Sequence, residues 1–177
     1  MTYDFDERLQ FSMGEKVTSD IKLLNNIFLG SMSVTKTSSD LDKLGVDYIV
    51  TLQDGAEIFI DVKTREKGAS KYWDYGEPEL AIEIWSVCCS KVGWNFSKKS
   101  AVDYILYTFD PSDYNQYYLF PFQQLRIASQ RNFHAWKSQY KTAFQSSYEW
   151  QSQAMFIPVS VVIKAIQYEM SGDLNAS

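Results

Sequence analysis

The segment that most constrains the fold is a predicted β-hairpin over residues 45–63, GVDYIVTLQDGAEIFIDVK. Two runs rich in β-branched and aromatic residues, 46–52 and 57–62, flank the turn Gln-Asp-Gly, and an Asp-Gly pair in this position is a strong hairpin signal. In an antiparallel hairpin the start of the first strand lies beside the end of the second. Three charged residues at those two ends are therefore expected to meet: Asp47, Asp61 and Lys63.

Strand alternation adds a direction to this cluster. Asp61 and Lys63 are two residues apart and share one face of the sheet, whereas Ile60 and Val62 point into the opposite layer. Two carboxylates at short distance repel each other and lose hydration, which is costly unless a cation lies between them. A hard divalent ion, Mg²⁺ or Mn²⁺, takes oxygen ligands and would relieve that cost. Lys63 would then lie where it can orient an attacking water or stabilise charge on a phosphate.

Each charged residue also has an ordinary structural interpretation. Asp47 could cap backbone groups near a turn, and Asp61 with Lys63 could form an exposed salt bridge that contributes little to stability. Taken singly, these interpretations are preferred. Taken together, the convergence of three charges at one sheet end favours a catalytic site.

The rest of the chain predicts one mixed α/β domain spanning residues 1–177, with residues 171–177 as a frayed polar tail. Helical spacing covers residues 4–24, weakened near Gly14, and then 121–127, 132–140 and 161–170, with Ser160 as a candidate N-cap. Beyond the hairpin, strands are expected at 27–34, 79–88, 104–109, 117–120 and 155–159.

Composition excludes several classes of protein. The longest apolar runs are far shorter than a membrane-spanning helix, and the N-terminus does not resemble a signal peptide, so we expect a soluble cytoplasmic protein without membrane contact. The adjacent Cys88 and Cys89 cannot build a disulfide framework, and burial is a better interpretation of them than a nucleophilic pair with His134, which is itself taken as structural. A net charge of −5 argues against broad adhesion to DNA, although it leaves room for a local basic groove.

The hairpin resembles the PD-(D/E)XK nuclease superfamily, which sets an Asp at the start of one strand and an Asp/Glu-x-Lys element on the next. Asp47 matches the first acid, within Gly-Val-Asp rather than Pro-Asp, and Asp61-Val62-Lys63 matches the second element. The family core is a helix, three antiparallel strands, a helix and a further strand. This chain offers a helix at 4–24, strands at 46–52, 57–63 and 79–87, then a short helix and a strand at 104–109. The stretch GWNFSKKSAVDYILYTF is similar to small nuclease-like proteins of phages and mobile elements.

This resemblance implies a restriction-endonuclease-like mixed sheet with flanking helices and a Mg²⁺- or Mn²⁺-dependent hydrolysis of DNA that leaves a 5′-phosphate. It also implies DNA as partner, allows a homodimer, and for a phage protein places the chain in the host cytoplasm. Asp47, Asp61 and Lys63 would be catalytic. The metal ligands would be Asp47, Asp61, the carbonyl of Val62 and Glu15 from the first helix, with Glu7 as the alternate.

Basic residues near the hairpin are candidate substrate contacts. They are Arg65, Lys67 and Lys71, in a loop rich in aromatic residues, and Lys98 and Lys99. Glu79 and Glu83, on the expected third strand, either reach the metal or face solvent. The alternative function is a catalytically idle nuclease fold that binds a protein or nucleic acid. The net charge favours that alternative, whereas the intact Asp47, Asp61 and Lys63 favour the enzyme.

Overall fold

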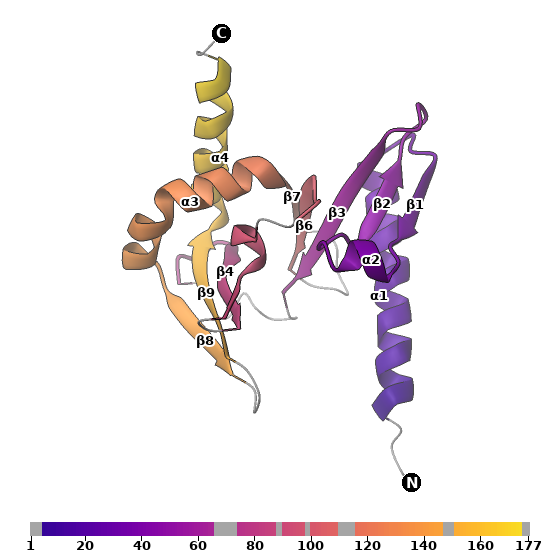
Figure 1. Cartoon of the computed structure of the whole chain (residues 1–177), viewed down its shortest axis with the longest axis horizontal. Helices are drawn as coiled ribbons and strands as arrows, with labels where there is room; N and C mark the ends of the chain where they lie inside the picture. The colour runs from indigo at the N-terminus through magenta and orange to yellow at the C-terminus, as the bar shows by residue number, and fades with distance from the viewer. Residues whose placement is uncertain are drawn as a thin grey trace.

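The fold contains two neighbouring β-sheets with helices packed around them (Figure 1). The computed structural model describes residues 5–65, 74–87, 90–97, 100–109, 116–146 and 151–174, apart from the side chains of residues 5–15, 39, 145–146 and 172–174. Within these ranges the architecture is mixed α+β. The four α-helices are α1 (Phe5–Ile27), α2 (Ser39–Asp42), α3 (Phe122–Gln139) and α4 (Val159–Leu174).

The first sheet holds the predicted hairpin. Its strand order is β1-β2-β3-β6-β7, with β1 to β3 antiparallel, β6 parallel to β3 and β7 antiparallel to β6. The hairpin turn is confirmed, and Gly55 adopts φ +83°, a left-handed conformation that glycine tolerates without strain. The strand bounds are β1 Ser33–Lys36, β2 Tyr48–Thr51, β3 Glu57–Thr64, β6 Tyr104–Thr108 and β7 Tyr117–Pro121.

The second sheet corrects the expected strand order. The predicted third strand, β4, forms as expected but does not pair with β3, since it lies in a separate sheet of order β5-β4-β9-β8. The place beside β3 is taken by β6. Alternating apolar residues identify β4 as a strand but carry no information about its partner. The bounds are β4 Glu79–Val87, β5 Lys91–Val92, β8 Thr142–Ser146 and β9 Gln151–Pro158.

The two faces of the first sheet pack against different parts of the chain. One face contacts α1, where Leu23 and Leu24 join Tyr48, Ile60 and Leu106 in one hydrophobic cluster. The opposite face packs against the second sheet, α3 and α4. These elements form a larger hydrophobic cluster that includes Ile105, Tyr107, Leu80, Ile82, Met155 and Trp136. The two sheets therefore share a hydrophobic core.

The helices are longer and more continuous than predicted. α1 runs through Gly14, and α3 joins the two predicted segments 121–127 and 132–140 into one helix. Ser160 lies inside the first turn of α4, not before it, and its hydroxyl donates a hydrogen bond to Glu77 at 2.9 Å. Among the described helices, none is long and apolar enough to cross a membrane. Cys88 and Cys89 lie outside the described residues, and His134 is exposed on α3.

Candidate active site

Asp47 and Asp61 face each other across the open end of the β2–β3 hairpin. The paired register ends at Tyr48 opposite Ile60, so Asp47 directly precedes this last pair on β2 and Asp61 directly follows it on β3. The Asp47 N–H donates to the Ile60 carbonyl at 2.8 Å, and the Asp47 Oδ2 accepts a hydrogen bond from the Val62 N–H at 2.8 Å. These two bonds fix the Asp47 side chain toward β3. The hairpin geometry therefore brings the two predicted acids together.

Lys63 is paired with Asp61. Its Nζ lies 2.7 Å from the Asp61 Oδ1, and the Lys63 side chain is 34% exposed whereas that of Asp61 is 6% exposed. Both point to the face of the sheet opposite Ile60 and Val62, which lie in the cluster with α1. The predicted alternation of side chains along β3 is confirmed. The ordinary structural interpretation expected an exposed salt bridge, but the Asp61 side chain is buried.

Burial controls the electrostatics of this cluster. It raises the pKa of the Asp61 carboxyl from 3.8 to about 7, against the lowering effect of the Lys63 ammonium. The neighbouring Asp47 carboxylate raises the pKa of Asp61 further. One lysine thus compensates two carboxylates only in part, and the ionised form of Asp61 gains from any additional cation placed beside it.

The backbone of Val62 lies at the same place. Alternate residues of a strand direct their N–H and C=O groups to the same side, so the Val62 carbonyl points toward β2, as the Ile60 carbonyl does. The Val46 N–H, one residue before Asp47, donates to the Leu41 carbonyl at 3.1 Å and does not continue the ladder to β3. The Val62 carbonyl therefore lies beyond the end of the hairpin ladder, beside Asp47.

These groups fit a hard divalent ion. The described residues contain no group of three or more His, Cys, Asp or Glu side chains that could hold a metal. Mg²⁺ commonly keeps several waters and is bound through only one or two carboxylates. Asp47 and Asp61, with the Val62 carbonyl beside them, supply that smaller set, and the buried Asp61 carboxylate would be stabilised by the charge. The residues present are those expected of a Mg²⁺ or Mn²⁺ site.

The contribution of the first helix stays a prediction. Glu15 lies in α1, but its side chain, like that of Glu7, is outside the described part of the chain. The described part of α1 packs on the face of the sheet opposite Asp61. A carboxylate that α1 does bring to the hairpin is Asp20, which is 1% exposed and accepts a hydrogen bond from the Tyr48 hydroxyl at 3.0 Å.

Only one of the predicted substrate-binding residues is described. Arg65 follows β3, and its guanidinium lies 4.9 Å from the centre of the Phe156 ring. It lines a cavity of about 500 Å³ next to Lys63. The other four candidates lie outside the described residues: Lys67, Lys71, Lys98 and Lys99.

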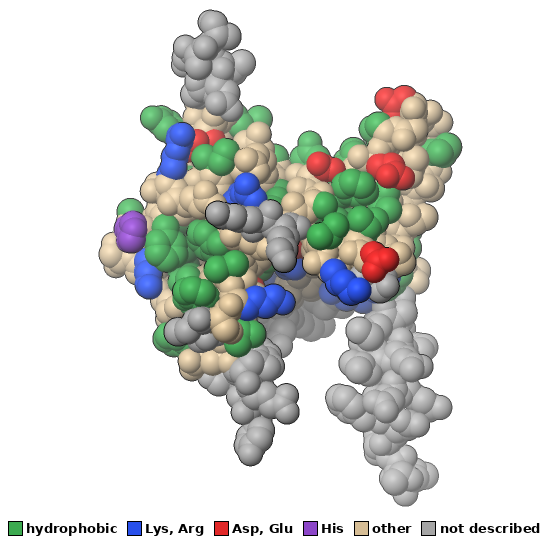
Figure 2. All heavy atoms as spheres, viewed as in Figure 1, with side chains coloured by type: hydrophobic (Ala, Val, Ile, Leu, Met, Phe, Trp, Pro, Cys, Tyr) green, Lys and Arg blue, Asp and Glu red, His purple; other side chains and the backbone are tan. Residues whose placement is uncertain are grey.

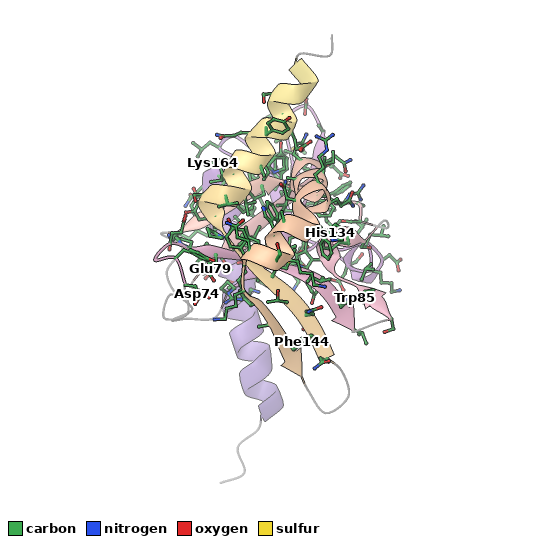
Figure 3. All side chains as sticks on the ribbon, turned by 90° about the vertical axis from the view of Figure 1, so that its left-hand side faces the viewer. Asp74, Glu79, Trp85, His134, Phe144 and Lys164 are labelled. Atoms are coloured by element: carbon green, nitrogen blue, oxygen red, sulfur yellow. The ribbon has the colours of Figure 1, made fainter. Side chains whose placement is uncertain are left out.

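Glu79 and Glu83 of β4 have different surroundings in the structure. Glu79 is buried and accepts a hydrogen bond from the Asp74 N–H at 2.8 Å, and the two residues lie close together (Figure 3). Glu83 lines the same cavity as Lys63 and accepts a hydrogen bond from the Ser86 hydroxyl at 2.7 Å. The interpretation of Glu79 as a solvated residue is wrong.

Sequence reasoning missed the aromatic lining of this cavity. Trp94 and Phe144 belong to it, and the Lys63 ammonium lies 5.9 Å from the centre of the Trp94 ring. The proximity of Trp94 to Lys63 could not be predicted from the sequence. Trp94 follows β4 and β5 of the second sheet, whereas Lys63 lies on β3 of the first sheet. Phe144 lies on β8, a strand that the sequence analysis did not predict.

Comparisons of the chain with protein-family models, with curated proteins and with solved structures gave no match. A functional conclusion therefore depends on the geometry and chemistry of the site itself.

Proposed function

We propose that this chain is a metal-dependent nuclease that hydrolyses DNA phosphodiester bonds, as the resemblance of its hairpin to the PD-(D/E)XK superfamily implies. The observation that carries the proposal is the meeting of the Asp47 and Asp61 carboxylates at the open end of the hairpin, with Lys63 paired to Asp61 at the edge of a cavity. A structural salt bridge has no need of a second carboxylate, which raises the electrostatic cost of the pair.

Each residue has a chemical role in this proposal. Asp47, Asp61 and the Val62 carbonyl would hold Mg²⁺ or Mn²⁺, which when bound supplies positive charge to the phosphate and lowers the pKa of a water. Lys63, partly exposed on the cavity side, orients the attacking water and balances the charge that develops on the phosphate. Arg65, two residues farther along, binds a neighbouring phosphate.

The surface charge is compatible with DNA despite the net charge of −5. On the face shown in Figure 2, most Asp and Glu side chains lie over β1 to β3, whereas most Lys and Arg side chains lie across the middle and the opposite part. A polyanion needs a local basic surface and not a basic protein as a whole.

Cleavage assays test the proposal. The protein is incubated with supercoiled, linear and single-stranded DNA in Mg²⁺, Mn²⁺ or EDTA, beside Asp61→Asn and Lys63→Met. We expect cleavage in Mg²⁺ or Mn²⁺, its loss in EDTA, and a fall of about 100-fold or more in each variant, the usual cost of removing an electrostatic or acid–base group.

Two matched variants serve as controls. Glu57→Gln removes an exposed carboxylate at the other end of β3, and Lys43→Met removes an exposed lysine that pairs with exposed Asp40. Both should cleave at the rate of the unchanged protein. Cleavage that persists in Asp61→Asn and Lys63→Met would sink the site assignment, and the absence of cleavage with every substrate would favour the alternative, a nuclease fold that only binds.

A further inference from the structure

The cavity beside Lys63 is large enough for a small ligand. Its volume of about 500 Å³ falls within the usual range of small-molecule sites, about 300–1,000 Å³. It lies between the end of β3 and the face of the second sheet. Lys63 is common to the carboxylate cluster and the cavity, because its Nζ is 2.7 Å from Asp61 and its side chain lines the cavity wall.

Small side chains create this space. On the floor formed by the second sheet, Ala154 of β9 lies between Ala143 of β8 and Glu83 of β4 in register. Ala81 and Ser152 also line the floor. A sheet face normally carries large apolar residues where another layer covers it. These short side chains on adjacent strands leave room for the cavity above the sheet.

The walls combine aromatic rings with positive charge. Trp94 lies beside the Lys63 ammonium, and Phe144, 58% exposed, stands at the edge of the second sheet (Figure 3). Arg65 lies over the Phe156 ring, and its Nε is buried without a hydrogen-bond partner among the described residues. A buried donor of this kind is costly unless a water or a ligand accepts from it, and an anionic ligand in the cavity would do so.

These features match one nucleotide. A planar base can stack on an aromatic wall and exchange hydrogen bonds with Glu83 and Ser152, and its phosphate can lie against two cations. We propose that the cavity holds one unpaired nucleobase of the strand whose phosphate lies at Lys63. The substrate class is then single-stranded or locally unpaired DNA, because a base stacked inside a duplex cannot enter a cavity. This inference rests on the proposed nuclease function.

Binding is measured without cleavage to test the inference. In the Asp61→Asn background, fluorescence anisotropy at one fixed salt concentration gives Kd values for a labelled single strand, the matching blunt duplex, and an abasic single strand of the same length. We expect the single strand to bind at least tenfold more tightly than either of the others. The abasic oligomer separates recognition of the base from recognition of phosphates.

Filling the cavity should remove this preference. Ala154→Leu places a larger side chain on the floor, and Trp94→Leu removes the aromatic wall; each should weaken single-strand binding by about tenfold, the order of one lost stacking contact. Binding of the abasic oligomer should change less than twofold. Ala135→Leu on exposed α3 surface and Tyr168→Leu, which is 70% exposed on α4, are the controls and should change neither.

The inference and the proposed function fail separately. Thermal melting first confirms that each variant is folded. Equal binding of the single strand, the duplex and the abasic oligomer, or single-strand binding that folded Ala154→Leu and Trp94→Leu both retain, overturns the inference, even if the unchanged protein cleaves DNA. Loss of cleavage in every condition overturns the nuclease function, whatever the anisotropy shows.

Discussion

Asp61 is a carboxylate in an environment that favours its neutral form. It is 4% exposed, it faces a second carboxylate, and a single lysine is its ion-pair partner among the described residues. A buried pair of this kind is weak evidence for stability, because desolvation can exceed the Coulombic gain. A carboxylate that destabilises the fold among apolar neighbours is expected where function requires it.

The first prediction concerns the pH dependence of stability without metal. Because burial raises the pKa of Asp61 from 3.8 to about 7, the folded state keeps a proton between about pH 4 and pH 7 that the unfolded state has released. The free energy of unfolding should therefore fall as the pH rises through that window. Asp61→Asn removes this penalty, so it should be more stable than the unchanged protein at pH 8, by as much as about 4 kcal/mol.

Urea denaturation in EDTA at pH 4, 6 and 8 measures this difference. The gap between Asp61→Asn and the unchanged protein should be smallest at pH 4 and grow with pH. Glu57→Gln, an exposed change on the same strand, should show no such trend. A gap that stays constant from pH 4 to pH 8 would rule out the raised pKa of Asp61.

At the scale of elements, the 3₁₀ turn η2 (Trp94–Phe96) places Trp94 against the site, and Gly93 is what lets the turn approach β4. The Gly93 N–H donates to the Ile84 carbonyl at 2.9 Å, and a Cβ at Gly93 would clash with the Glu83 carbonyl oxygen. That oxygen belongs to the backbone and cannot move aside as a flexible side chain can.

Gly93→Ala should therefore push η2 away from β4 and lower the free energy of unfolding by about 1–3 kcal/mol or more. It should also lower cleavage, because Trp94 moves relative to Lys63. The matched control is Gly55→Asn, at a left-handed position with open space around it, where Asn is tolerated. Denaturation midpoints give the comparison, and a folded Gly93→Ala protein of unchanged stability would show that the close approach is not required.

The same elements show what the sequence could and could not reveal. The hairpin is encoded locally, by alternation and by Asp54-Gly55, so the meeting of Asp47, Asp61 and Lys63 was predictable. The partner of β4 was not, because strand pairing depends on contacts between residues far apart in the chain. The aromatic wall was missed for that reason, since Trp94 of η2 and Phe144 of β8 line the cavity beside Lys63 although both are far from the hairpin in sequence.

At the scale of the whole molecule, the shared core predicts that the two sheets unfold together. The described tryptophans, Trp85, Trp94 and Trp136, all lie on the side of the second sheet, whereas Leu24 of α1 is fully buried against the far face of the first. Leu24→Ala should cost about 2–5 kcal/mol, as cavity-forming substitutions do. Its effect should reach tryptophan fluorescence although no described tryptophan lies near it.

Urea titrations followed by circular dichroism and by tryptophan fluorescence should shift together in Leu24→Ala. Leu29→Ala, at a residue that is 86% exposed, should shift neither. A circular dichroism transition that moves while the fluorescence transition stays in place would mean that the two sheets are independent units.

The most direct test of the account is calorimetric titration with Mn²⁺ at pH 7.5. We expect saturable binding that both Asp47→Asn and Asp61→Asn weaken at least tenfold. Glu57→Gln should bind Mn²⁺ as the unchanged protein does. Equal affinity in Asp61→Asn and the unchanged protein would contradict the claim that these two facing carboxylates are a metal site.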